Sequence, residues 1–221
     1  MLDCFNAMRL FSALLLVSLN TFGGAIVSTF DANSDGWLVA DDGANTAVTY
    51  VAAGGHPGGA IQRQDADLNG YMHFQAPAKF LGNLTPYFNG TLSYDLLQTV
   101  RDTDTTWYYR ELLQGAGMLI LHTVGLTPDT ANWRHFDVPL NAAAGWIAVP
   151  TIEDFMGAPV TDAQFQAVLA NVTALYITGD LISGHDLATL DNVSVQAAPE
   201  PSTCALIAVG VGSLLMLRKR R

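Results

Sequence analysis

The chain has 221 residues, of which 50% are apolar and 14% are charged. A sequence so apolar and so poor in charge can fill a core, which excludes an intrinsically disordered protein. Residues 26–197 carry five basic and 18 acidic side chains, a net charge of −13. Such an acidic surface repels phosphate backbones, so we do not expect nucleic acid as a partner.

Residues 1–25 have the organisation of a secretory signal. An apolar stretch at residues 10–19 follows Arg9 and precedes the small residues Gly23, Gly24 and Ala25. This order of a basic residue, an apolar segment and a small-residue cleavage region is typical of exported proteins. We therefore predict a signal peptide over residues 1–25 and export of the chain.

Residues 26–197 read as one β domain without cysteine, since Cys4 and Cys204 both lie outside it. Short runs rich in β-branched and aromatic residues are separated by Gly, Asn, Asp and Pro. In residues 90–97, Leu92, Tyr94 and Leu96 alternate with polar side chains, which predicts a half-buried strand. The sequence predicts a mainly β, antiparallel sandwich. Its expected strands cover residues 27–30, 36–40, 46–52, 70–75, 90–98, 106–113, 117–124, 133–138, 145–149, 174–178 and 186–195.

One short helix is expected after residue 161. Thr161 and Gln164 have the spacing of a capping box, in which each side chain bonds the other residue's main chain. Phe165, Val168 and Leu169 then recur at helical spacing. The helix crosses between two strands.

A calcium ion is expected near the start of the domain. Residues 31–36 (DANSDG) match the opening of an EF-hand loop, but the flanking segments are strand-like, and an Asx turn is an alternative. Residues 190–193 (LDNV) resemble the final strand of sandwich modules that hold a structural ion near their first strand. We therefore expect Asp31 and Asp191 to share a Ca²⁺ ion through hard carboxylate oxygens.

Several stretches of the domain resemble the laminin IV (laminin B) domain. They are residues 74–83 (FQAPAKFLGN), residues 87–96 (YFNGTLSYDL) and the helix of residues 165–171 leading into residues 174–177. The resemblance implies a jelly-roll sandwich similar to carbohydrate-binding modules and a family without a known catalytic activity. The chain departs from that family by having no cysteines in the domain and no flanking epidermal-growth-factor-like repeats.

Three adjacent aromatic residues are the candidate ligand contacts. Alternation along a strand turns at least one ring of Trp107, Tyr108 and Tyr109 outward, where it can stack on a sugar; a core or edge role is the alternative. The histidines show no metal-ligand spacing, so we expect them to be structural. The sequence has no nucleophile elbow, phosphate loop or dinucleotide fingerprint, and we predict that the protein is not an enzyme.

Residues 198–221 carry a second targeting signal, after the signal peptide. Pro199, Glu200 and Pro201 precede an apolar run at residues 204–217, which ends in four basic residues. The run is short for a membrane span, but its basic flank can snorkel and would lie in the cytoplasm. The three parts together resemble the PEP-CTERM sorting signal, which implies a transmembrane sorting helix, processing by an exosortase and a Gram-negative bacterium.

These features point to an exported, non-catalytic protein of the cell surface or exopolysaccharide matrix that binds glycan or matrix. Its expected partners are an exosortase during sorting, an extracellular polysaccharide, and the membrane through residues 198–221. A glycan-active enzyme on the same sandwich and a purely structural matrix component are the alternatives.

Overall fold

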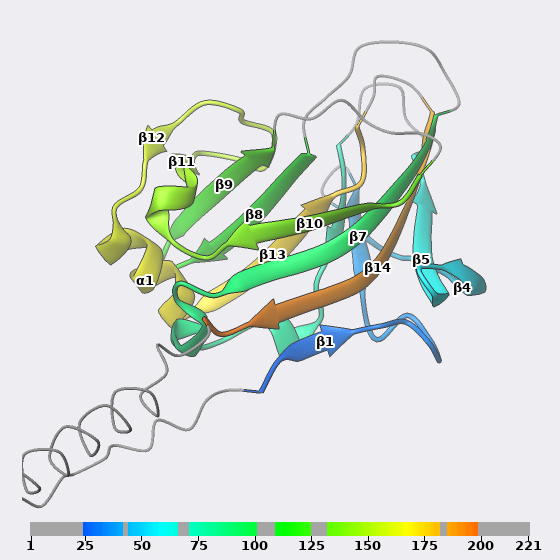
Figure 1. The fold of residues 1–221 in the computed structure, drawn as a ribbon. Coiled ribbons are helices and arrows are strands. Elements are labelled where there is room, and N and C mark those ends of the chain that lie inside the picture. Colours follow the sequence, from blue (N-terminus) through cyan, green and yellow to red (C-terminus); the bar gives the residue numbers. More distant parts are fainter. Residues whose placement is uncertain are drawn as a thin grey trace, which may run out of the picture.

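The computed structural model describes residues 24–41, 44–65, 71–100, 109–124, 132–181 and 185–198. In these ranges the chain forms two antiparallel β-sheets packed face to face, with one α-helix at an end of the sandwich (Figure 1). The predicted jelly-roll-like sandwich with a single short helix is confirmed. Residues 1–23 and 199–221, which hold most of the predicted signal peptide and sorting segment, lie outside the described residues, and the domain bounds 26–197 stay a prediction.

Within the described ranges, no helix is both long and apolar enough to span a bilayer.

The six-stranded sheet carries the residues on which the functional proposal rests. Its central strand β14 pairs with β7 on one side, and with β5 and β1 on the other. In order across the sheet, the strands are β10 (Arg134–Pro139), β7 (Thr91–Val100), β14 (Asp186–Gln196), β5 (Gly58–Gln64) and β4 (Thr49–Gly55), and β1 (Ile26–Ser28) shares the edge of β14 with β5.

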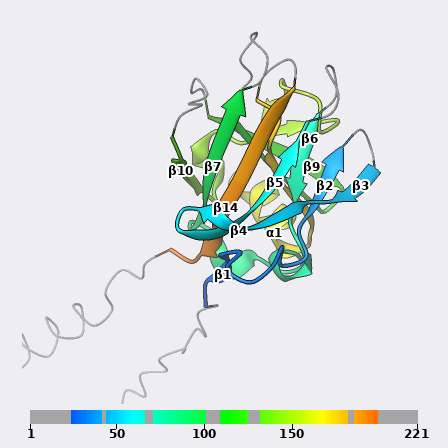
Figure 2. The same ribbon diagram turned by 90° about the vertical axis from the view of Figure 1, so that its right-hand side faces the viewer.

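The eight-stranded sheet lies behind the first in the view of Figure 1. Strands β2 and β3 form one of its edges, beside β6 (Figure 2). In order, its strands are β12 (Ala158–Pro159), β11 (Ile147–Val149), β9 (Met118–Val124), β8 (Tyr109–Gly115), β13 (Val172–Thr178), β6 (Met72–Gln75), β2 (Leu38–Asp41) and β3 (Ala44–Ala47). The described connections also contain the 3-10 helices η1 (Ala78–Phe80), η2 (Thr85–Tyr87) and η3 (Ala142–Ala144).

Strand β7 shows the predicted alternation, with one difference. Leu92, Tyr94 and Leu96 point into the core between the sheets, as expected. Ser93 and Asp95 point to the opposite face, yet both are also buried. The strand is therefore covered on both faces rather than half-buried, because other polar side chains close over Asp95.

Aromatic rings close one end of the core. Helix α1 (Asp162–Ala170) begins at Thr161 with the predicted capping box in place. Its residue Phe165 is buried and meets Trp146 edge-on, with ring centroids 5.4 Å apart. The helix therefore acts as a plug for the sandwich, and its prediction from the sequence is confirmed.

Strands β5 and β12 were not predicted, and residues 46–52, expected as one strand, are divided between β3 and β4. Strand β5 begins with two glycines and ends with Gln62, Arg63 and Gln64, so it lacks the apolar alternation that signals a strand. It forms because β14 and β4 supply hydrogen-bonding partners on both of its edges.

Candidate functional site

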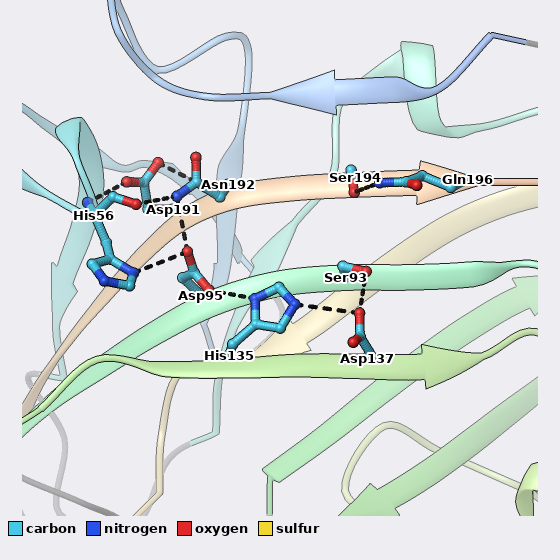
Figure 3. A network of polar contacts seen from close by, with 9 residues as sticks. All are labelled: His56, Ser93, Asp95, His135, Asp137, Asp191, Asn192, Ser194 and Gln196. Atoms are coloured by element: carbon cyan, nitrogen blue, oxygen red, sulfur yellow. Dashed lines mark hydrogen bonds and ion pairs between the residues drawn. The ribbon is translucent and has the colours of Figure 1, made fainter.

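A polar face covers the side of the six-stranded sheet that is turned away from the core (Figure 3). Cross-strand pairing produces it, because Asp95 of β7 lies between His135 of β10 and Asp191 of β14. The next row pairs Ser93 with Asp137 and with Ser194. We use the name polar face for His56, Ser93, Asp95, His135, Asp137, Asp191, Asn192, Ser194 and Gln196.

Asp95 is the centre of this face. Its side chain is bonded at both oxygens: Oδ1 accepts from His135 Nδ1 at 2.6 Å, and Oδ2 accepts from Asn192 Nδ2 at 2.8 Å and His56 Nδ1 at 3.2 Å. The residue is only 5% exposed, whereas the side chains of His56 and His135 are 58% and 56% exposed. One buried carboxylate thus fixes the orientation of two imidazoles that remain open to solvent.

The two imidazoles differ in their surroundings. The hydrogen bond to Asp95 raises the pKa of His135 above its usual value, against partial burial, and the charges of Asp95 and Asp137 act in the same direction. His56 instead lies parallel to the indole of Trp133, with ring centroids 5.8 Å apart and planes 7° apart. A flat stacked surface and a hydrogen-bonding imidazole therefore flank the same carboxylate.

A β-bulge encloses the neighbouring Asp191. The register of β14 shifts between Asp191 and Ser194, and Asn192 adopts a positive φ of 51° there. Asp191 accepts the main-chain N–H groups of His56 at 2.6 Å and Asn192 at 2.7 Å. Burial raises the pKa of Asp191, and the nearby charges of Asp95 and Asp31 add to that rise.

The structure brings the two predicted calcium ligands to the same turn. Asp31 and Asp191 both lie against the turn between β4 and β5. If a Cβ atom were added to Gly58, it would lie 2.6 Å from Asp31 Oδ1, and one added to Gly55 would lie 2.7 Å from Asp191 Oδ2. Among the described residues, no group of three or more His, Cys, Asp or Glu side chains is placed to hold a metal ion. A calcium ion at Asp31 and Asp191 would therefore draw further oxygen ligands from the main chain and water.

The loop that resembles an EF-hand is a turn between strands. It joins β1 to β2, and Asn33 Oδ1 accepts the Asp35 N–H at 2.7 Å, which makes an Asx turn. The EF-hand alternative is therefore excluded, since that motif needs a helix on each side. Asp35 forms an ion pair with Lys79 and accepts a hydrogen bond from Ser28.

The other predicted site residues fall mostly outside the described part of the chain. Trp107 and Tyr108 lie in the undescribed segment 101–108, and the backbone of Tyr109 opens β8, where it pairs with Val124. The sorting residues Pro199, Glu200 and Pro201 also lie outside.

Sequence reasoning did not identify Asp95, His56 or His135 as site residues. The alternation of β7 did place Asp95 on the face away from the core, which was the available signal for that residue. No local pattern connects His56 with Asp191, since 135 positions separate them in the chain. His135 was expected to be structural; its bond to Asp95 agrees with that, but its exposure also leaves it accessible to a ligand.

A separate polar cluster lies inside the core. Tyr94 of β7 donates a hydrogen bond to Glu111 of β8, and Glu111 also accepts from His122 Nδ1 at 2.8 Å. Glu111 is fully buried; its bond to Tyr94 joins the two sheets, and its bond to His122 of β9 lies within the eight-stranded sheet. This carboxylate is a structural link in the sandwich.

Comparison with known proteins assigns the family. Residues 73–211 match the profile of the laminin B (domain IV) family, which is more than half of the chain. The chain belongs to the laminin B (domain IV) family. Laminin subunit gamma-1 of Xenopus tropicalis is 25% identical to it over 178 residues, which cover 79% of this chain and 10% of that subunit. This laminin IV domain chain thus spans about a tenth of the length of that relative.

Solved structures with the same fold include a laminin domain and glycan-related modules. The L4b domain of human laminin alpha-2 superposes with a TM-score of 0.62 at 16% identity, covering 80% of this chain and 98% of that domain. The family 11 carbohydrate-binding module of a Clostridium thermocellum cellulase has a TM-score of 0.51 at 14% identity, with 81% and 98% coverage. An exo-beta-agarase matches over 25% of its own length and 78% of this laminin IV chain, with a TM-score of 0.51 at 10% identity.

Proposed function

We propose that this laminin IV domain is a non-catalytic glycan-binding module and that the polar face takes the sugar. The observation that carries the proposal is the buried Asp95 carboxylate, which orients two half-exposed imidazoles. Sugar recognition needs fixed hydrogen-bonding groups beside a flat ring surface, because a sugar presents hydroxyls at its rim and C–H groups on its faces. The His56–Trp133 stack supplies the flat surface, and His135 with Asp137 supplies the polar groups.

The fold is compatible with this role. A family 11 carbohydrate-binding module shares it, which supports the proposal at the level of architecture. Trp107, Tyr108 and Tyr109 remain proposed glycan contacts separate from the polar face, because β8, which Tyr109 opens, belongs to the other sheet.

A glycan-active enzyme is the second candidate, since Asp95 and Asp191 lie side by side on the polar face and an exo-beta-agarase contains a module of similar fold. Two adjacent carboxylates are the usual machinery of glycoside hydrolysis. However, Asp191 is fully buried, and main-chain N–H groups bond both of its oxygens. That environment suits a structural carboxylate better than a proton donor to substrate.

One screen separates binding, hydrolysis and a purely structural role. The full chain is titrated with a panel of neutral and acidic polysaccharides, and reducing ends are counted after incubation. We expect binding without release of reducing ends. Release above a buffer control would make the protein an enzyme, and failure to bind any polymer of a broad panel would leave the structural role.

Two variants locate the binding surface. His135→Ala and His56→Ala are expected to weaken glycan binding about tenfold or more, while the matched control Gln166→Ala on the exposed side of α1 leaves it unchanged. Unchanged affinity in both histidine variants, with the fold intact, would remove the polar face from the proposal.

We further propose that the chain is exported and sorted to the cell surface or extracellular matrix of a Gram-negative bacterium. Residues 1–25 would direct export, and Pro199, Glu200 and Pro201 would form the signal that an exosortase reads. The apolar run that follows would hold the precursor in the membrane until processing. Membership in a family that includes a laminin subunit supports an extracellular location.

A structural Ca²⁺ ion at Asp31 and Asp191 completes the proposal. Burial and neighbouring acidic charge disfavour the ionised form of Asp191, and a cation between the two carboxylates would relieve both effects. The ion would pin the turn between β4 and β5, and with it His56, against β14.

A further inference from the structure

A second polar site lies on the opposite side of the molecule, on the outer face of the eight-stranded sheet. Leu112 of β8 belongs to a small apolar cluster on that face, so alternation turns Arg110, two residues earlier, to the same side. On β6, Met72 and Phe74 belong to the main core, so His73 points outward as well. β13, which separates β6 from β8, contributes Thr178, whose Oγ1 lies 3.1 Å from His73 Nδ1.

Arg110 is buried without a hydrogen bond. The residue is only 1% exposed, and its Nε, Nη1 and Nη2 atoms have no hydrogen-bond partner in the structure. It forms no ion pair within 4.0 Å with any described carboxylate; the charge of Asp180 acts on it from further away. A buried guanidinium carries five N–H donors, and leaving them unsatisfied is costly. The described residues therefore leave the guanidinium donors without a hydrogen-bond acceptor, while the buried carboxylate of Asp180 balances part of the charge of Arg110 from beyond ion-pair distance.

Two aromatic rings restrict how such an acceptor can approach. The guanidinium carbon lies 4.4 Å from the ring centre of Phe155 and 5.5 Å from that of Tyr71, which are 6.2 Å apart. Both rings lie within cation–π distance of the planar guanidinium group, whose charge they stabilise. The N–H groups point outward in that plane, so a partner has to come edge-on. A planar carboxylate is the group that fits such an edge with two parallel hydrogen bonds.

His73 adds a further group to the site. It is fully buried, and its Nε2 has no hydrogen-bond partner. Burial and the positive charge of Arg110 lower the pKa of His73 to about 3, so the imidazole is neutral at ordinary pH. A carboxylate beside Arg110 would accept from a neutral imidazole N–H as well.

We propose that Arg110 and His73 form a second subsite, which binds the carboxylate of an acidic sugar, a uronate unit of a glycan chain. The choice of a sugar as the ligand rests on the proposed glycan-binding function, because the site by itself indicates only a carboxylate. The subsite lies on the other sheet from the polar face, so the two are independent.

Phe155 controls entry to this subsite. It belongs to residues 150–157, which connect β11 to β12, and its ring covers Arg110. Its neighbour Met156 is 85% exposed, so the outer side of this connection faces solvent. Because Arg110 is buried under this ring, binding of a sugar would require the Phe155 side chain to move outward, and Phe155→Ala is expected to speed association.

The test compares the binding of an acidic trisaccharide with that of its uncharged methyl ester. The full chain is titrated calorimetrically with trigalacturonate and with the same trisaccharide fully methyl-esterified. We expect the acid to bind at least tenfold tighter than the ester. Arg110→Lys keeps the positive charge but loses the planar fork, and should abolish this preference, whereas the matched control Arg63→Lys on β5 of the other sheet should retain it.

A second measurement needs no variant. In ¹⁵N-labelled wild-type protein, the Nε–Hε resonance of Arg110 should shift as the acid is added and stay in place with the ester. Equal binding of acid and ester, an unmoved Arg110 resonance, or full preference in folded Arg110→Lys would each overturn the subsite and leave bound water as the acceptor.

The role of the polar face is tested separately, with the same two ligands. His135→Ala should weaken binding of the ester, which depends on the polar face, and leave the tight binding of the acid at Arg110 unchanged, because the two subsites lie on different sheets. If His135→Ala has no effect and neutral polymers fail to bind, while Arg110 still discriminates acid from ester, the proposed function of the polar face falls and the subsite stands.

Discussion

Asp95 combines two properties that usually exclude each other: it sits on a strand's outward side, and it is 5% exposed. The desolvation cost of burying this carboxylate is offset because three side chains donate hydrogen bonds to its two oxygens. The half-exposed imidazoles are consequently held in one orientation before any ligand arrives, which reduces the entropy lost on binding.

Replacing Asp95 by Asn tests this role. Asp95→Asn should lower the free energy of unfolding by about 1–3 kcal/mol, because the side chains of His56, His135 and Asn192 lose their charged acceptor. Asp137→Asn is the control, since that side chain is 65% exposed and should have a smaller effect. Denaturant unfolding measures both, and equal effects would contradict the central role of Asp95.

The same variant should change the pH dependence of stability. His135 has a raised pKa in the folded state, so its contribution is complete below about pH 6.5 and is lost as pH rises through the folded-state pKa. The groups that face it are Asp95 on β7 and Asp137 on its own strand, with His56 across Asp95. Thermal unfolding between pH 6 and 8 should therefore show a decline that Asp95→Asn reduces.

His73 should act in the opposite direction. Its folded-state pKa is lowered to about 3, so the unfolded chain takes up a proton first when pH falls below about 6.5. Stability is lost by up to about 1.4 kcal/mol per pH unit between pH 6.5 and 3. His73→Gln cannot titrate, and its unfolding curves between pH 6.5 and 4.5 should lose that share of the acid sensitivity. A slope identical to wild type would show that His73 is already protonated in the fold.

At the scale of elements, strand β5 depends on close backbone approach. A Cβ at Gly59 would overlap the carbonyl oxygen of Phe30 and crowd the Tyr50 ring. Gly59→Ala should therefore destabilise the protein by roughly 1–3 kcal/mol, as overpacking does. Gly24→Ala, where a Cβ has open space, is the control for the same chemical change. Comparable melting temperatures for the two variants would show that β5 is displaced from this position.

The turn between β4 and β5 gives the calcium prediction. An ion bound only by the folded state stabilises it by about 2.7 kcal/mol at a hundredfold excess over the dissociation constant. That corresponds to a rise of several degrees in melting temperature. Asp31→Asn should remove the rise. Identical melting in calcium and in chelator would eliminate the ion.

The elements that sequence patterns predicted are those with local signals. Helix α1 was located by its capping box, and β7 by the alternation of Leu92, Tyr94 and Leu96. Strand β5 has no such signal, because tertiary pairing rather than composition makes it a strand. The candidate site is missed for the same reason: its hydrogen bonds join residues as distant as His56 and Asp191, and register across three strands is not written in any short segment.

At the scale of the whole molecule, the sorting proposal gives a test by mass. Protein released from the cell surface should lack residues after about position 200, because Pro199, Glu200 and Pro201 would mark the processing site. Pro199→Ala combined with Pro201→Ala should leave unprocessed precursor in the membrane. Released protein that still ends at Arg221 would contradict processing.

The position of β14 constrains when the sandwich can form. This strand, at residues 186–196, pairs with β7 on one edge and with β5 and β1 on the other. While the ribosome is still synthesising earlier residues, the six-stranded sheet has a gap at its centre, and contacts of such high sequence separation form late. The nascent chain therefore does not gain the stabilising contacts of the six-stranded sheet before residue 196 is synthesised. A transport machinery that accepts only unfolded polypeptide could therefore engage the nascent chain, still unfolded, throughout synthesis.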